Sequence, residues 1–147
     1  KYLSHHAKSM SPLAVAYGIL RKVNIRYKYN LISKFVTRGS LLDIGCGTGE
    51  LLHYFNNNAW KTMGIEPNES ARNFGKTAYK LEVVDEVELN NLPEKNFDVV
   101  SMWHVLEHVP LLNQRLNEAK RLLSDNGILV IALPNIASWD AQYYGRY

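Results

Sequence analysis

Residues 41–50, LLDIGCGTGE, join a short apolar run to three glycines at alternate positions. Glycine serves where the backbone takes a positive φ or must lie close to another group, because no Cβ intrudes. The apolar run has the length of a buried strand, and the residues from Glu50 onward have a helical pattern. The stretch therefore predicts a strand, a tight glycine loop and a helix, with a ligand lying against the loop.

The same alternation of strand and helix continues along the chain. Besides residues 41–44, the runs that predict strands are KTMGIEP (61–67), KLEVV (80–84), FDVVSMW (97–103) and GILVIALP (127–134). The predicted helices are 50–56, 70–77 and 111–123, the last ending at SDNG with Gly127 as its left-handed cap. Such alternation is typical of α/β proteins, in which helices cover both faces of a parallel sheet.

Residues 11–36 precede this alternation and have apolar residues at helical spacing. Ser11 followed by Pro12 is a typical helix start, with serine as the N-cap and proline in the first turn. The pattern is interrupted near Asn24. The segment therefore predicts one or two helices ahead of the first strand.

Composition and charge narrow the functional classes. The net charge of +3 comes without a nucleic-acid-binding motif, and the basic run RKVNIRYK (21–28) lies in an amphipathic stretch, so nucleic acid is disfavoured as a partner. No apolar run approaches the roughly 18 residues of a membrane span, and no secretory signal begins the chain. A single cysteine, Cys46, cannot form an internal disulfide. These features predict a cytoplasmic protein without a membrane span.

Residues that directly follow the strands are candidates for the site, because ligands of open parallel sheets bind at the carboxyl ends of the strands. They are the glycine loop, Glu66, Asp85 and Glu86, Trp103 and His104, and Pro134 and Asn135. Glu66 follows Gly49 by 17 positions, near the roughly 20 expected of an acid that binds ribose hydroxyls. The spacing therefore favours a ligand that contains a ribose.

Two classes of nucleoside cofactor compete for the glycine loop. A dinucleotide loop has the spacing G-x-G-x-x-G, with a pyrophosphate at the helix start beside the third glycine. This chain has Gly45, Gly47 and Gly49, and Glu50 stands in the place of that third glycine. Because a carboxylate there would repel a diphosphate, the sequence disfavours a nucleotide-dependent oxidoreductase and favours a ligand without phosphate.

Four motifs in this order resemble those of the Rossmann-like S-adenosylmethionine-dependent methyltransferases, and most of all a bacterial branch related to the ubiquinone-pathway O-methyltransferases. They are LLDIGCGTGE, GIEPN, FDVVSMWHVLEHV and LLSDNGILVIALPN, covering about residues 40–135. The resemblance implies a doubly wound, mostly parallel α/β sheet in the order 3-2-1-4-5, with helices on both faces. The family continues to the order 3-2-1-4-5-7-6, so we expect the closing hairpin to be missing by truncation.

The resemblance implies S-adenosylmethionine as the cofactor and assigns residues to it. The glycines pass beneath its methionine and ribose parts, Asp43 lies under its amino-acid portion, and Glu66 holds the ribose hydroxyls. Asp85, Glu86 and Glu88 compete for the position beside the adenine, and Trp103 is as well explained by packing as by ligand contact. The expected cofactor contacts are Asp43, Gly45, Cys46, Gly47, Gly49, Glu66, Pro67, Asp85, Glu86, Trp103 and His104.

The stretch HVLEH, residues 104–108, allows two interpretations. If a helix begins at Trp103, then His104, Glu107 and His108 share one face and could bind a divalent metal ion. Some methyltransferases that resemble this chain bind metal through a similar stretch with Glu at the first position, where this chain has His104. We therefore predict no metal, and take His104, nearest the strand end, as a candidate general base.

The combined expectation is a methyltransferase that moves a methyl group to an oxygen or nitrogen of a small-molecule, glycan or lipid-precursor acceptor. The rival interpretation is a methyltransferase-like module that binds the cofactor without catalysis. Residues 1–39 would form a helical lead-in, 40–135 the cofactor-binding core, and 136–147 the start of a truncated, substrate-facing segment. The sequence specifies neither the acceptor nor the oligomeric state.

Overall fold

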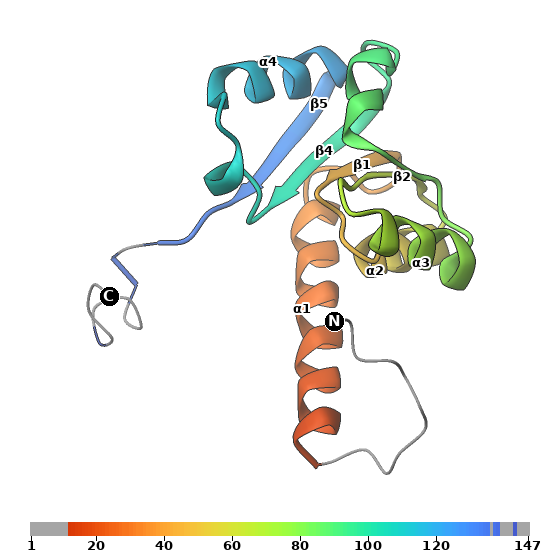
Figure 1. The fold of residues 1–147 in the computed structure, drawn as a ribbon, viewed down its shortest axis with the longest axis vertical. Coiled ribbons are helices and arrows are strands. Elements are labelled where there is room, and N and C mark those ends of the chain that lie inside the picture. Colours follow the sequence, from red (N-terminus) through yellow and green to blue (C-terminus); the bar gives the residue numbers. More distant parts are fainter. Residues whose placement is uncertain (1–11, 136, 139–142, 144–147) are drawn as a thin grey trace.

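The computed structural model describes residues 12–135, 137, 138 and 143, and at its centre is a five-stranded parallel sheet (Figure 1). The strands are β1 (Ser40–Ile44), β2 (Lys61–Ile65), β3 (Val83–Val84), β4 (Phe97–Trp103) and β5 (Leu123–Ala132). Their order, β3-β2-β1-β4-β5, confirms the predicted Rossmann-like fold. The winding direction reverses between β1 and β4, which makes the carboxyl end of β1 the expected ligand-binding place.

Helices cover both faces of the sheet, which explains the continuous apolar runs in the strands. The helices are α1 (Pro12–Ser33), α2 (Glu50–Asn57), α3 (Glu69–Tyr79) and α4 (Leu112–Leu122), with 3₁₀ turns η1 (Glu86–Asn91) and η2 (Leu106–His108). Side chains of β1 alternate between two cores: Leu41 packs with α1 and α2, whereas Leu42 packs with α4, η1 and η2. Asp43, next along the strand, therefore faces α1.

Helix α1 is continuous through Asn24, so the structure has one helix where the sequence allowed one or two; an asparagine costs a helix interior only tenths of a kcal/mol relative to better formers. The helix begins at Pro12 as predicted, while Ser11 lies outside the described residues. Its C-terminal half is anchored by the buried Ile32, whereas Leu13 is 81% exposed, and Figure 1 shows that end standing away from the sheet. Among the described helices, none combines the length and apolar character that a bilayer crossing needs.

The junction between α4 and β5 differs from the prediction. Helix α4 ends at Leu122 and β5 begins at once, so Gly127 lies inside the strand and its φ is not positive. The pairing with β4 shifts between Leu123, opposite Phe97, and Ile128, opposite Val99. A Cβ on Gly127 would lie 3.0 Å from the Phe97 carbonyl oxygen, so close packing explains this glycine better than a helix cap.

The third strand is shorter than predicted, because α3 extends into the segment expected to be extended. Lys80 is the left-handed C-cap of α3, with φ 57°, and the Leu81 N–H that follows it donates to the Gly75 carbonyl. Only Val83 and Val84 remain as β3, paired with Gly64 and Ile65 of β2. This short strand still brings the acids that follow it beside the carboxyl end of β2.

Candidate active site

The glycine loop between β1 and α2 needs glycine for its backbone conformation. Gly45, Gly47 and Gly49 have φ angles of 76°, 56° and 81°, which side-chain-bearing residues rarely adopt. A Cβ on Gly45 would lie 2.5 Å from Val105, and one on Gly49 equally close to Leu81. At Gly47, by contrast, a Cβ would meet no described atom within 4 Å. The loop thus turns tightly at its two ends and leaves open space at its centre.

The carboxylate of Glu66 fixes this loop from the end of β2. Glu66 is buried; its Oε2 accepts a hydrogen bond from the Gly47 N–H at 2.8 Å, and its Oε1 accepts one from the Asn68 N–H at 2.9 Å. Each carboxylate oxygen keeps a further acceptor direction. Glu66 therefore orders the glycine loop, a role that the sequence analysis did not assign, and retains capacity for a ligand hydroxyl.

A cavity of about 490 Å³, here called the α1 cavity, lies between α1 and the glycine loop. The predicted cofactor contacts that line this cavity are Asp43, Gly45, Cys46, Gly47 and Trp103. Helix α1 contributes Tyr17, Leu20, Arg21, Asn24, Ile25 and Lys28 to its wall. The sequence analysis missed these six, although the basic run at 21–28 could have drawn attention to them.

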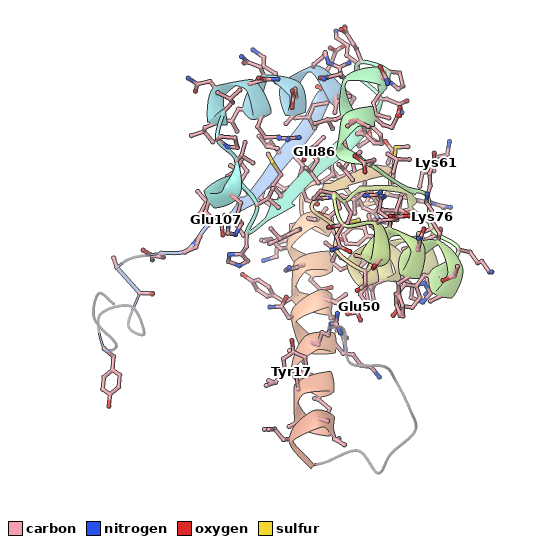
Figure 2. All side chains as sticks on the ribbon, in the orientation of Figure 1. Tyr17, Glu50, Lys61, Lys76, Glu86 and Glu107 are labelled. Atoms are coloured by element: carbon pink, nitrogen blue, oxygen red, sulfur yellow. The ribbon has the colours of Figure 1, made fainter. Side chains whose placement is uncertain are left out.

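A larger cavity, of about 730 Å³, lies at the opposite edge of the sheet. It is lined at the amino ends of β1, β2 and β4 by residues that include Ser40, Lys61 (labelled in Figure 2) and Asp98. Ligands of parallel sheets bind at the other ends of the strands. Its size therefore does not make it the candidate site.

Asp43 is a buried acid in the wall of the α1 cavity. It is 3% exposed, and its Oδ1 accepts a hydrogen bond from the Ser101 hydroxyl at 2.6 Å. Burial raises the pKa of Asp43 to about 7, although the Ser101 hydrogen bond and the charge of Lys28 both act to lower it. The cavity therefore holds a carboxyl group that titrates near neutral pH.

Burial also raises the pKa of the Cys46 thiol, and the neighbouring acids Asp43 and Glu66 raise it further. The thiol consequently stays protonated and is a poor nucleophile. A Cβ added to Gly64 of β2 would lie only 2.5 Å from the Cys46 sulfur, so the two residues are in close contact. Close packing between the loop and β2 is thus the observed role of this side chain.

Glu50 connects the glycine loop to α1. It is the first residue of α2, lines the α1 cavity and forms an ion pair with Arg21. Figure 2 shows Glu50 beside α1. Because the guanidinium offsets the carboxylate charge, the electrostatic argument against a diphosphate at this helix start is weaker than the sequence alone indicated.

The acids after β3 point to different neighbours. Asp85 forms an ion pair with Arg72, 2.8 Å between Oδ2 and Nη1, and the same Nη1 donates to the carbonyl oxygens of Glu66 and Pro67 at 2.7 Å each. Arg72, which the sequence analysis missed, thus joins Asp85 to the turn after β2. Glu86 instead forms an ion pair with the buried Arg115 of α4 and lines a separate cavity of about 230 Å³.

No continuous helix forms over HVLEH, so the helix that a metal site required is absent. Strand β4 runs through Trp103, His104 follows with φ 58° and its N–H donating to the Ala132 carbonyl, and η2 covers only Leu106–His108. His104 Nδ1 lies 3.6 Å from Glu107 Oε1, and 62% of the His104 side chain is exposed. Over the described ranges, no three His, Cys, Asp or Glu side chains gather closely enough to hold a metal ion.

Comparisons with known proteins agree with this geometry. A family model described as a methyltransferase domain matches residues 19–146. The chain is 34% identical over 145 residues to an uncharacterized protein of Methanocaldococcus jannaschii, covering 92% of this chain and 56% of that one. It is 32% identical over 106 residues to a ubiquinone biosynthesis O-methyltransferase of Rhodopseudomonas palustris, covering 65% of this chain and 40% of that one.

Among solved structures, a SAM-dependent methyltransferase from Archaeoglobus fulgidus superposes with a TM-score of 0.71 at 28% identity, over 84% of this chain and 57% of that one. The chain thus spans about half the length of the relatives that it matches. Because the family model covers most of the chain and the sheet has the matching strand order, the chain belongs to the Rossmann-like S-adenosylmethionine-dependent methyltransferase family.

Proposed function

We propose that the protein transfers the methyl group of S-adenosylmethionine to an oxygen or nitrogen atom of a small-molecule, glycan or lipid-precursor acceptor. The observation that carries the proposal is the α1 cavity, which lies over the glycine loop at the carboxyl end of β1. The open space at Gly47 leaves room for a flat ligand against the backbone, and the buried Trp103 Nε1 has no hydrogen-bond partner in the described chain. The residues present therefore fit a nucleoside ligand.

In this proposal the glycines lie beneath the cofactor, with Cys46 and Pro67 as its neighbours at the ends of β1 and β2. Glu66 binds the ribose hydroxyls through its remaining acceptor directions, and Asp43 faces the amino-acid end. Of the acids after β3, Asp85 is the best supported neighbour of the adenine, since Arg72 ties it to the Glu66 turn. The ion pair of Glu86 with Arg115 argues against the adenine role predicted for Glu86.

The sulfonium of S-adenosylmethionine supplies an already activated methyl group, so the protein's task is to align the acceptor and exclude water. Trp103 ends β4 at the edge of the cavity, and His104 follows with its imidazole exposed. An imidazole in this position can take a proton from an oxygen or nitrogen acceptor. We therefore assign to His104 the role of general base.

The test has two stages on the full-length protein. Titration calorimetry with S-adenosylhomocysteine, and separately with NAD, measures which cofactor class binds. A methyl-transfer screen over phenolic, amine, sugar and lipid-precursor acceptors then measures activity. Binding followed by transfer supports the proposal, binding without transfer to any acceptor favours the non-catalytic module, and selective binding of NAD contradicts the cofactor assignment.

The Glu66→Ala variant should bind S-adenosylhomocysteine more weakly by about 1.5–3 kcal/mol, the value of hydrogen bonds to a charged group. The loss has two sources, the ribose contact and the Gly47 N–H that Glu66 now satisfies. Calorimetry measures it, with Glu94→Ala as the control, because Glu94 is an exposed acid outside the α1 cavity. Unchanged affinity in Glu66→Ala would remove this residue from the ligand.

The His104→Asn variant should lower kcat by at least about 100-fold, the lower end of the range for loss of a general base, with little change in S-adenosylhomocysteine affinity. Asparagine is chosen because it tolerates the positive φ of this position. His108→Asn is the matched control and should keep its turnover, and a chelator should not affect either enzyme. Normal kinetics in His104→Asn, or loss of activity on chelation, would refute this assignment.

A further inference from the structure

Helix α1 carries apolar side chains on the side that faces away from the core. They recur every three or four residues, the spacing of one helix face, and we call them the α1 stripe: Leu13, Ala16, Leu20, Val23 and Tyr27, with Ile19 beside them. All six are exposed, and the five larger ones are between 57% and 81% accessible, whereas Ile32 on the opposite side of α1 is buried. Figure 1 shows the first turns of the helix extending beyond the sheet. The described chain thus leaves the α1 stripe open to another surface.

Positive charge is concentrated around this helix. Residues 1–42 contain eight of the 17 lysines and arginines and none of the 14 acidic residues, so this segment has a charge of +8 and the rest of the chain −5. Lys22 and Arg26 follow Ile19 and Val23 by three positions, so each lies beside the α1 stripe. Both are exposed, and no carboxylate oxygen of the described chain lies within 4.0 Å of either cation. The apolar surface is therefore bordered by unpaired positive charge.

An anionic lipid surface is complementary to both features of the helix. Its acyl boundary takes up an apolar helix face, and its headgroups attract the lysines and arginines beside that face. A second copy of α1 fits less well, because the helix has no acidic residue to pair with the cations of its partner. Nucleic acid would attract the cations but leave the apolar side chains in water.

We propose that the α1 stripe, together with Lys22 and Arg26, docks the protein on an anionic lipid surface. The helix then lies along that surface, and the sheet stays on its water side, because the opposite face of α1 packs on the core through Ile32. Leu20 belongs to the stripe and also lines the α1 cavity, so the wall of this cavity adjoins the docked face. The inference goes beyond the proposed function, since docking is independent of the acceptor.

Flotation of the full-length protein with lipid vesicles measures the docking. Vesicles of phosphatidylcholine with about 30% phosphatidylglycerol should bind it at least about tenfold more tightly than vesicles of phosphatidylcholine alone, and added salt should remove most of this difference. Val23→Gln should weaken binding to the anionic vesicles by about tenfold, because an amide replaces apolar surface. Lys22→Gln and Arg26→Gln should each weaken it by about fivefold, the value of one cation at an anionic surface.

Two matched substitutions away from α1 are the controls. Val87→Gln changes a valine of η1 that is 72% exposed, and Lys76→Gln changes an exposed lysine of α3 that is labelled in Figure 2. Both proteins should bind vesicles as the wild type does. Thermal unfolding establishes that every variant is folded before its binding is measured.

A wild-type protein that does not bind the anionic vesicles overturns the proposal, and so does equal binding to both kinds of vesicle. Binding that the Val23, Lys22 and Arg26 variants leave unchanged places the docking surface elsewhere and overturns it as well. A dimer that Val23→Gln dissociates, seen by sedimentation velocity without vesicle binding, would assign the α1 stripe to a second copy of the chain. Calorimetry with S-adenosylhomocysteine on the same protein tests the proposed function separately, so that the two can fail independently.

Discussion

From about pH 5 to pH 8, the free energy of unfolding of the Asp43→Asn variant should rise by about 2.5 kcal/mol relative to that of the wild type. Burial raises the pKa of Asp43 from 3.8 to about 7, so the native state keeps a proton that the unfolded chain has already lost in this range. Raising the pH therefore lowers wild-type stability until the pKa of about 7 is passed. Asparagine cannot ionise, so the variant escapes this loss.

Urea unfolding at pH 5, 6, 7 and 8 measures the difference between the two proteins. Asp98→Asn is the control, because hydrogen bonds from the Ser40 N–H and hydroxyl lower the pKa of Asp98. Asp98 is thus ionised in both states throughout the range, and its difference from wild type should not change with pH. A flat difference for Asp43→Asn would contradict the burial of an ionisable group at this position.

The expected loss of folding stability that Asp43 causes above neutral pH supports a functional role for this residue in the α1 cavity. A buried acid that weakens the fold above neutral pH is the kind of residue that function retains. The charge of Lys28 only partly offsets the effect of burial on Asp43. We expect the positively charged amino group of the bound cofactor to stabilise the Asp43 carboxylate further.

The Gly47→Val variant should lose at least about 100-fold in affinity for S-adenosylhomocysteine, because its side chain would fill the open space over the loop. The φ of 56° at this position also strains a β-branched residue. Gly47→Asn separates the two effects, since asparagine tolerates this backbone but still occupies the space. Both variants should lose binding, measured by calorimetry.

Gly18→Ala serves as the control for these substitutions. Gly18 also has open space around its Cβ position, but it lies in α1 without a positive φ and outside the α1 cavity. The change should leave binding intact and favour the helix, where alanine is preferred to glycine. A folded Gly47→Asn protein with normal affinity would show that the ligand does not cross the glycine loop.

Much of the fold could be predicted because it depends on residue patterns within short segments of the sequence. The run predicted as a strand over residues 97–103 is the strand Phe97–Trp103, and the three alternate glycines all have positive φ. Both follow from neighbouring residues alone: a run buried on both faces is continuously apolar, and a tight turn needs glycine. The rule for carboxyl ends then selected the glycine loop and Trp103, and the structure shows that both line the α1 cavity.

The alternatives and predictions that the structure rejects concern positions where contacts outside the local stretch compete with the pattern. A helix over residues 103–109 was the alternative that a metal site required, but Trp103 continues the pairing of β4 with β5, and the His104 N–H bonds to Ala132. Gly127 has the sequence of a helix cap, but the chain enters β5 directly after α4. In both places sheet hydrogen bonds replace those that a helix would have made.

The sequence by itself determined the glycine loop and the acids that follow the strands, because each depends on spacing within one short segment. The strand order was predicted from the resemblance to a known family, and the structure confirms it. Only the tertiary structure decides where α1 lies against the core. The position of Lys28 over Trp103 and the ion pair of Arg21 with Glu50 follow from it. The choice between Asp85 and Glu86 likewise depends on Arg72 and Arg115. These contacts join residues distant along the chain, and no periodicity encodes them; they arise only when buried faces pack and charges must find partners.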